Sequence, residues 1–300
     1  MNTANTDTPE TWRDLYPYEP HYAVMPSGHR MHYVDEGNGP PVVLLHGNPT
    51  WSFMYRDLIR ELRGTFRVIS PDHIGCGLSD KPQDYRYQLC DHISNLKYLL
   101  DEVLELRSTS LVVHDWGGAI GMGYAVSKPE RVARIVLLNT ASFLLGDCPW
   151  RIRVCRLPLF GSVALRRFNA FARGALSMAM PAGESLEGAI REGYLHPYDS
   201  YANRIATLRF VQDIPLSPRH PSWETVGGIQ KNLHLLEDKP ILICWGEQDF
   251  CFTLSFLKIW QQYFPAAAVR RFPEAGHYLL ESACSEIAPL VAGFLSGTGS

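Results

Sequence analysis

The sequence lacks the features that mark exported, membrane-spanning or nucleic-acid-binding proteins. Residues 1–20 contain no basic segment followed by an apolar run, and no apolar stretch elsewhere approaches the length of a membrane span. The formal net charge of −3 provides no global basic field for nucleic acid or for an anionic membrane surface. We therefore expect a small, uncharged, apolar ligand, no nucleic-acid partner and no membrane span.

Cysteine patterns that indicate disulfides or metal sites are also missing. The seven cysteines are odd in number and scattered, without a Cys-x-x-Cys pair or a metal-ligand spacing. We interpret them as reduced thiols, mostly core fillers, in a cytoplasmic protein. No metal ion or organic cofactor is expected from the sequence.

What is present is an alternation of short apolar runs with helical segments. Apolar runs without polar interruption are typical of strands buried on both faces. They occur at residues 42–45, 67–70, 111–113, 135–138 and 241–244. Helix-like segments such as 90–104 and 119–127 lie between them, which predicts an α/β protein with a mostly parallel sheet and helices on both faces. A hairpin at 22–25 and 31–34 makes the expected sheet mixed.

The alternation stops after residue 140, and the sequence up to residue 241 is helical and aromatic. We therefore predict a core in two parts, 1–140 and 218–300, with a helical cap inserted at 141–217. Apolar cap residues recur at helical spacing, with arginines elsewhere on the expected helix. The apolar positions are Leu157, Phe160, Ala164, Phe168, Phe171 and Ala175, and the arginines are Arg156, Arg166, Arg167 and Arg173. This face either packs on the core or forms a docking surface or an acyl-chain entrance.

The segment 111–118 has the layout of a nucleophile elbow, with a buried strand that runs into a glycine-flanked turn and then a helix. In that motif a strained turn exposes the nucleophile at the carboxyl edge of the sheet. Asp115 occupies the nucleophile position. A carboxylate there attacks a saturated carbon and forms an alkyl-enzyme ester, which argues against esterase and lipase chemistry. The alternative role for Asp115 is to cap the following helix.

Two later segments supply the remaining members of a triad in the chain order of the α/β-hydrolase fold. Asp249 follows the 241–244 run, and His277 follows another short strand candidate at 268–272. Both positions lie at the expected carboxyl edge of the sheet, where ligands and catalytic groups gather. Asp249 is expected to orient the His277 imidazole and to stabilise its charged form.

Two further residues are candidates for binding an oxyanion or a departing anion. Asn48 follows the first buried strand, in the loop that supplies one oxyanion-hole N–H, and Trp116 follows the nucleophile and supplies the other. The Asn48 amide and the Trp116 indole N–H are additional donors. Asn48 can equally be a turn residue before Pro49. The turn-rich loop 72–80 is interpreted as structural.

Four segments together resemble the haloalkane dehalogenase family over almost the whole chain. They are His46-Gly47-Asn48-Pro49-Thr50, residues 73–82, His114-Asp115-Trp116-Gly117-Gly118 and Gly276-His277. The resemblance implies an α/β-hydrolase fold with an eight-stranded sheet, Asp115 as nucleophile, Asp249 and His277 as its partners, and halide binding by Asn48 and Trp116. Epoxide hydrolases share two of these motifs.

Other stretches resemble a narrower group, the β-lactone decarboxylases of bacterial long-chain olefin biosynthesis. They are residues 51–53, 193–195, 197–200 and 209–216. This resemblance implies conversion of a cis-dialkyl β-lactone to a cis-alkene and carbon dioxide. It leaves open whether Asp115 attacks the saturated carbon or the carbonyl, and whether His277 activates water or acts as a proton shuttle. It also implies assembly with other enzymes of olefin biosynthesis, such as the β-lactone synthetase.

The sequence thus leaves four functions open, with the decarboxylase first. A haloalkane dehalogenase would use His277 as the base that hydrolyses the ester. An epoxide hydrolase would need two cap tyrosines near the leaving oxygen, for which Tyr194, Tyr198 and Tyr201 are available. A non-catalytic receptor of the same fold would not need the complete triad.

Overall fold

A computed structural model describes residues 11–144, 148–157 and 161–298 and contains an eight-stranded sheet in the order β1-β2-β4-β3-β5-β6-β7-β8. The strands are β1 His21–Val24, β2 Arg30–Glu36, β3 Pro41–Leu45, β4 Arg67–Pro71, β5 Thr109–Asp115, β6 Val132–Thr140, β7 Ile241–Gly246 and β8 Ala268–Phe272. Each strand overlaps a run that the sequence indicated. The β1–β2 and β2–β4 pairs are antiparallel and all other pairs are parallel, so the predicted mixed, mostly parallel sheet is confirmed.

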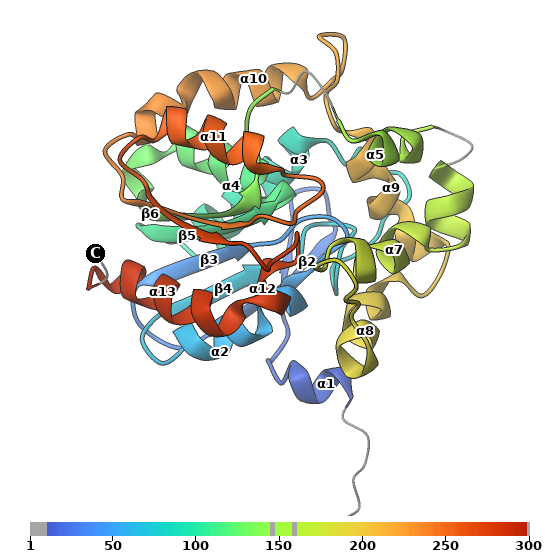
Figure 1. Cartoon of the computed structure of the whole chain (residues 1–300), viewed down its shortest axis with the longest axis horizontal. Helices are drawn as coiled ribbons and strands as arrows, with labels where there is room; N and C mark the ends of the chain where they lie inside the picture. Colours follow the sequence, from blue (N-terminus) through green and yellow to red (C-terminus); the bar gives the residue numbers. More distant parts are fainter. Residues whose placement is uncertain (1–10, 145–147, 158–160, 299–300) are drawn as a thin grey trace, which may run out of the picture.

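Helices cover both faces of this sheet (Figure 1). On one face lie α3 Leu89–Tyr98, α4 Trp116–Ser127, α10 Trp223–Asn232 and α11 Leu254–Tyr263. On the other lie α2 Arg56–Leu62, α12 Leu279–Ser282 and α13 Cys284–Ser296, while α1 Trp12–Leu15 lies beside the cap helix α8 Gly188–Leu195 (Figure 1). Each group buries its apolar side chains in a separate core cluster against the strands, which is the three-layer architecture of the α/β-hydrolase fold.

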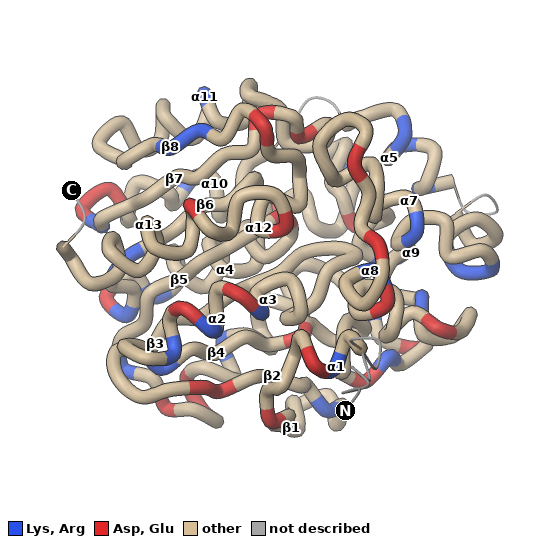
Figure 2. The backbone as a smooth tube through the Cα atoms, turned by 60° about the horizontal axis from the view of Figure 1, so that its bottom comes forward, with Lys and Arg blue, Asp and Glu red and all other residues tan. Residues whose placement is uncertain are grey.

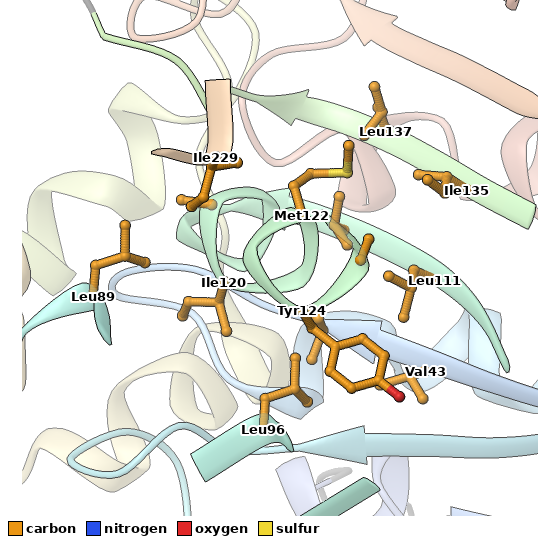
Figure 3. Close-up of a cluster of buried hydrophobic side chains, with 14 of the residues drawn as sticks. Val43, Leu89, Leu96, Leu111, Ile120, Met122, Tyr124, Ile135, Leu137 and Ile229 are labelled. Atoms are coloured by element: carbon orange, nitrogen blue, oxygen red, sulfur yellow. The ribbon is translucent and has the colours of Figure 1, made fainter. Parts of the chain in front are cut away.

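Helix α4 is the central element of the first layer (Figure 3). Ile120, Met122 and Tyr124 are fully buried between the strands and the neighbouring helices, where they contact the cluster that contains Leu96 of α3 and Ile229 of α10. Helix α4 therefore has apolar residues on every side, and its first turn is fixed directly beyond the end of β5.

The chain between β6 and β7 contains no further strand in its described residues. Apart from short 3-10 turns, its described helices are α5 Trp150–Cys155, η4 Ser162–Arg167, α7 Ala170–Met178, α8 Gly188–Leu195 and α9 Ile205–Gln212, followed by α10 on the sheet. Helices α5, α7, α8 and α9 lie together beyond one end of the sheet (Figure 1). The domain limits at residues 140 and 217 remain a prediction.

The expected apolar face along one cap helix is wrong in two respects. Asn169 has a left-handed φ of 54°, which asparagine adopts more readily than most residues. This residue separates η4 from α7. Leu157 and Phe168 are exposed, whereas Ala164 and Phe171 pack inward. The apolar residues therefore keep their helical spacing across a point where one helix ends and the next begins. Phe160 lies outside the described residues.

None of the helices in the described ranges has both the length and the hydropathy needed to cross a membrane.

Candidate functional site

Asp115 stands at the junction of β5 and α4, in a strained backbone conformation. Its φ of 50° and ψ of −125° are unusual for a residue with a side chain, and the predicted elbow accounts for them. Two glycines make room for this turn. A Cβ on Gly47 would lie 1.9 Å from Asp115 Oδ1, and one on Gly117 would lie 2.0 Å from the Leu45 carbonyl oxygen. Any other residue at these positions would displace the turn.

The Asp115 carboxylate is held by the two backbone donors that the sequence predicted. The Asn48 N–H donates a 2.7 Å hydrogen bond to Oδ1, and the Trp116 N–H also stabilises the carboxylate. The side chain makes no capping bond to α4, although Asp115 is the N-cap residue of that helix. The capping alternative therefore does not describe this carboxylate.

The structure brings Asp115, Asp249 and His277 together from the ends of three strands. Asp249 follows β7 and His277 follows β8, and the His277 Nδ1 to Asp249 Oδ2 distance is 2.7 Å. On the other side of the ring, Nε2 lies 3.9 Å from Asp115 Oδ2. All three side chains are buried. The imidazole is thus oriented by one carboxylate and faces the other, as in a nucleophile–histidine–acid triad.

Asn139, near the end of β6, is a site residue that the sequence analysis missed. Its side-chain N–H donates 2.9 Å to Asp249 Oδ2, and its Oδ1 accepts a 2.7 Å bond from the Gly246 N–H. The other Asp249 oxygen accepts bonds from the backbone of Cys251 and Phe252. The signal available in the sequence was an asparagine directly after a buried apolar run, and no spacing linked it to Asp249.

Burial and charge act on the pKa of both ends of the triad. Burial raises the pKa of Asp115 above its usual value, against the opposing effects of the His277 charge and the two backbone donors. For His277, burial would lower the pKa, but the charge and hydrogen bond of Asp249 and the charge of Asp115 outweigh it and raise the pKa. Both carboxylates therefore stabilise the charged form of the His277 ring.

Asn48 and Trp116 both line the same cavity as Asp115. One Asn48 amide N–H donates to the Thr207 carbonyl oxygen at 3.2 Å, and the NH₂ group has a second hydrogen for a ligand. Trp116 lies against Phe210 of α9, with ring centroids 5.4 Å apart. Helix α9 of the cap thus orients the predicted anion-binding pair. The turn alternative for Asn48 does not explain this pairing.

The cavity above Asp115 has a volume of about 480 Å³ and a largely apolar wall. Asp115, His277, Asn48 and Trp116 line it together with cap residues such as Leu165 and Phe171. An apolar cavity in which a few polar groups converge is typical of a small-molecule site. Within the described ranges, no three His, Cys, Asp or Glu side chains are grouped to hold a metal ion.

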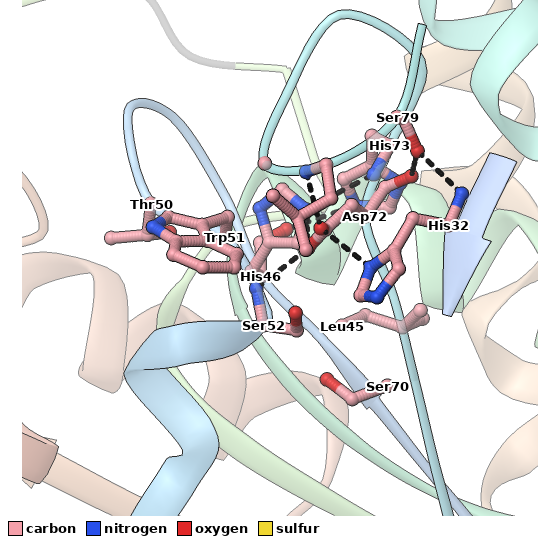
Figure 4. Close-up of polar contacts among 12 residues, drawn as sticks. His32, Leu45, His46, Thr50, Trp51, Ser52, Ser70, Asp72, His73 and Ser79 are labelled. Carbon is pink, nitrogen blue, oxygen red and sulfur yellow. Dashed lines mark hydrogen bonds and ion pairs between the residues drawn. The ribbon is translucent and has the colours of Figure 1, made fainter. Parts of the chain in front are cut away.

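The loop 72–80 supports the site without lining it (Figure 4). Asp72 Oδ1 accepts a 2.7 Å bond from the Ser52 N–H, and its Oδ2 lies 2.8 Å from both the Leu78 N–H and His32 Nδ1. This buried carboxylate ties β2 to the segment that follows Asn48. The loop therefore has the structural role that its sequence indicated.

The three cap tyrosines do not reach the cavity. The Tyr194 hydroxyl donates 2.6 Å to Glu281, the Tyr198 hydroxyl points to the Thr50 carbonyl oxygen, and Tyr201 is largely exposed beneath Arg166. None of the three lines the cavity. This arrangement lacks the pair of tyrosines that the epoxide hydrolase alternative requires.

Comparison with known proteins identifies the family. The model of the alpha/beta hydrolase fold family matches residues 40–283. A cis-3-alkyl-4-alkyloxetan-2-one decarboxylase of Shewanella oneidensis is 46% identical, over 95% of this chain and 90% of that protein. A protein of the same name from Xanthomonas campestris is 40% identical, over 93% of this chain and 97% of that one. Haloalkane dehalogenase 2 of Mycobacterium tuberculosis is 31% identical, over 92% and 95%.

Solved structures agree with this assignment. Haloalkane dehalogenase DbeA from Bradyrhizobium elkani superposes with a TM-score of 0.85 at 25% identity, covering 93% of this chain and 98% of that one. An ancestral haloalkane dehalogenase gives 0.84 at 25% identity, over 93% and 99%. The chain belongs to the α/β-hydrolase family, in the group that contains the cis-3-alkyl-4-alkyloxetan-2-one decarboxylases and the haloalkane dehalogenases.

Proposed function

We propose that this protein is a β-lactone decarboxylase that converts cis-dialkyl β-lactones to cis-alkenes and carbon dioxide, with Asp115 as nucleophile. The observation that carries the proposal is the placement of the Asp115 carboxylate in an apolar cavity of this size. An oxetan-2-one is a β-lactone, so the names of the relatives at 46% and 40% identity support this substrate class.

In the first step, an Asp115 oxygen attacks the saturated ring carbon that bears the lactone oxygen. The carbon–oxygen bond of the ring breaks, and its electron pair becomes that of a carboxylate on the neighbouring carbon. The product is an alkyl ester of Asp115 with a carboxylate in the β position. The Asn48 amide and the Trp116 indole are the donors for this newly formed anion.

In the second step, the bond between the β carbon and the carboxylate breaks and releases carbon dioxide. Its electron pair forms the carbon–carbon double bond, and the ester bond breaks to regenerate the Asp115 carboxylate. No water or external proton is consumed. Attack with inversion followed by anti elimination keeps the two alkyl groups on the same side, so a cis-lactone gives a cis-alkene.

Attack at the saturated carbon is preferred to attack at the lactone carbonyl because of the backbone donors. A carbonyl addition generates an oxyanion that needs free N–H donors. Here the Asn48 and Trp116 N–H groups already act on the Asp115 carboxylate itself. They fix the attacking oxygen, and displacement at a saturated carbon needs no oxyanion hole.

His277 is assigned the role of a cation beside the reacting groups. Its raised pKa, for which Asp249 and Asp115 are responsible, extends the pH range in which the ring is an imidazolium. While the ring is an imidazolium it cannot remove a proton from water, and the 2.7 Å contact with Asp249 continues to stabilise this charge after Asp115 has become an ester.

The second candidate function is that of a haloalkane dehalogenase. The Asn48 and Trp116 side chains at the cavity favour it, since two N–H donors also suit a halide. In this reaction neutral His277 would activate water to hydrolyse the alkyl ester. The tyrosine positions give no such support to an epoxide hydrolase.

The biological setting follows from the same proposal. We infer a place in long-chain olefin biosynthesis in the cytoplasm, with assembly beside enzymes such as the β-lactone synthetase. We also retain the division into a core, 1–140 and 218–300, and a cap, 141–217. Limited proteolysis and size-exclusion chromatography with the synthetase test the domain limits and the assembly.

Incubation of the purified protein with a cis-dialkyl β-lactone, and separately with 1-bromobutane, tests the reaction. Gas chromatography measures alkene and an ion assay measures bromide. We expect cis-alkene from the lactone and much slower bromide release. Rapid bromide release with an intact lactone would instead assign the chain to the dehalogenases.

A further inference from the structure

The cap concentrates positive charge that the net charge of the whole chain conceals. Residues 148–183 contain six arginines and no lysine, aspartate or glutamate, although the chain as a whole has a net charge of −3. Four of these arginines are exposed, at positions Arg151, Arg153, Arg167 and Arg173. Figure 2 shows basic segments beside α5 and α7. This part of the cap thus carries an excess of positive charge, although Glu187, directly before α8, lies beside Arg173.

The same elements expose large apolar side chains. Trp150 is 70% and Phe168 65% exposed, and they are the most exposed of the large apolar residues described. The full set on these elements is Trp150, Leu157, Val163, Phe168 and Met178. Exposed apolar residues that occur singly need no explanation, but this group lies on consecutive elements. We define the exposed residues of α5, η4, α7 and the adjoining positions 157 and 168 as the cap face.

The elements of the cap face form one packed unit. Ile152 of α5 and Leu165 of η4 share a small buried cluster with Leu208 and Val211 of α9, and Phe171 of α7 packs against it. The inward sides of these elements are therefore occupied by one another and by α9. Their outward sides carry the exposed arginines and apolar residues.

The cavity above Asp115 opens through the cap face. All the exposed residues among those that line the cavity belong to α5 or α7, and they are Trp150, Arg151, Ala170 and Met178. The ligand therefore enters and leaves between these two helices. Because the wall is apolar, the cavity suits an apolar ligand.

We infer that the cap face docks on the surface of an anionic lipid bilayer, so that the cavity opens directly into the lipid phase. Arginines together with Trp, Phe, Leu and Met on one face are the composition of segments that lie in a membrane interface. Anionic lipids complement the excess of positive charge, and the apolar side chains reach the boundary of the acyl chains. A protein docked on this face would cover the opening of the cavity. A bilayer would instead place the opening next to an apolar phase that dissolves apolar substrate and product.

This inference does not rest on which bond the enzyme breaks, and vesicle flotation tests it directly. The full chain is mixed with vesicles of phosphatidylcholine alone or of phosphatidylcholine with phosphatidylglycerol. We expect the protein to float with the anionic vesicles, to float much less with the neutral ones, and to be released by salt because exposed charges are screened.

A pair of matched triple variants distinguishes the cap face from the rest of the surface. The test variant is Arg167→Gln/Phe168→Ala/Arg173→Gln, whose three positions are exposed and do not line the cavity. The control is Val24→Ala/Arg107→Gln/Arg270→Gln, which removes the same charge and one exposed apolar side chain outside the cap. We expect the test variant to bind anionic vesicles about tenfold more weakly, and the control to bind like the original protein.

Circular dichroism of both variants confirms that they are folded. Equal flotation of the test and control variants overturns the inference. If the original protein does not float with anionic vesicles, the inference is also overturned. An acidic protein surface is then the partner that the cap face fits. Turnover of a short, water-soluble substrate, which needs no bilayer, separates these outcomes from a failure of the proposed reaction.

Discussion

Nε2 of His277 lies 3.9 Å from Oδ2 of Asp115, while Nδ1 of the same ring lies 2.7 Å from Oδ2 of Asp249. The imidazole therefore lies between two carboxylates, which are positioned by the ends of different strands of the sheet. The first distance leaves the Asp115 oxygen free to attack a ligand, and the second fixes the ring. The chemistry of the site depends on this asymmetry.

Asp115→Asn should abolish alkene formation, with a loss of about 10³-fold or more, because an amide oxygen is a poor nucleophile at saturated carbon. The variant should be at least as stable as the original protein, since burial raises the pKa of Asp115 and its charged form is costly to bury. Gas chromatography and thermal unfolding measure the two effects. Activity within tenfold of the original would remove Asp115 from the nucleophile role.

His277→Gln separates the two candidate reactions. With 1-bromobutane the variant should release one bromide per protein molecule and retain a butyl ester, because no base remains to activate water. Mass spectrometry of the intact protein detects the ester. With the lactone, the variant should still release alkene, at a reduced rate. Sustained bromide release by the variant would show that His277 is not the base for hydrolysis.

Asn139→Ala should lower kcat by about 10–100-fold with little change in KM, because Asn139 positions Asp249 and does not contact the cavity. Asn232→Ala is the matched control, since its side chain bonds only within α10. Steady-state kinetics of both variants provide the comparison. Equal kcat values for the two would mean that Asn139 does not act through the triad.

Asp213 should make stability depend on pH. It follows α9, and its carboxylate accepts bonds from the Leu89 N–H and the Ser222 hydroxyl. Burial raises its pKa to about 6, despite the lowering effect of these bonds. A folded-state pKa above the unfolded value of about 3.9 means that the folded protein holds this proton more tightly.

The stabilising contribution of the proton on Asp213 is complete below about pH 4 and is lost as the pH rises to about 6, for a total of about 3 kcal/mol. Asp213→Asn should remove this part of the pH dependence, so its unfolding free energy should fall less over that range. Urea unfolding of both proteins across the range measures the difference. Parallel curves would contradict the assignment.

Most of the fold and of the triad could be predicted from the sequence because both depend on short segments. Continuous apolar runs identified the strands, and a parallel sheet brings their carboxyl ends to one edge. Asp115 and Asp249 each end or follow such a run, and His277 follows the short strand candidate at 268–272, so their meeting required no knowledge of side-chain packing.

The features that the sequence did not predict depend on long-range contacts or on one backbone conformation. Asn139 joins the site through a partner that is 110 residues away in the chain. The left-handed Asn169 breaks the cap between two helical segments whose spacing continued across it. The concentration of arginine was visible in the sequence, but only the structure places these arginines around the opening of the cavity.

The most direct test of the central claim follows oxygen from solvent during turnover in water enriched in oxygen-18. Elimination from the Asp115 ester uses no water, so many turnovers of a cis-dialkyl β-lactone should leave the peptide that contains Asp115 unlabelled. Turnover of 1-bromobutane, which requires hydrolysis of the ester, should label the same peptide. Labelled Asp115 together with a hydroxy acid product from the lactone would contradict the account.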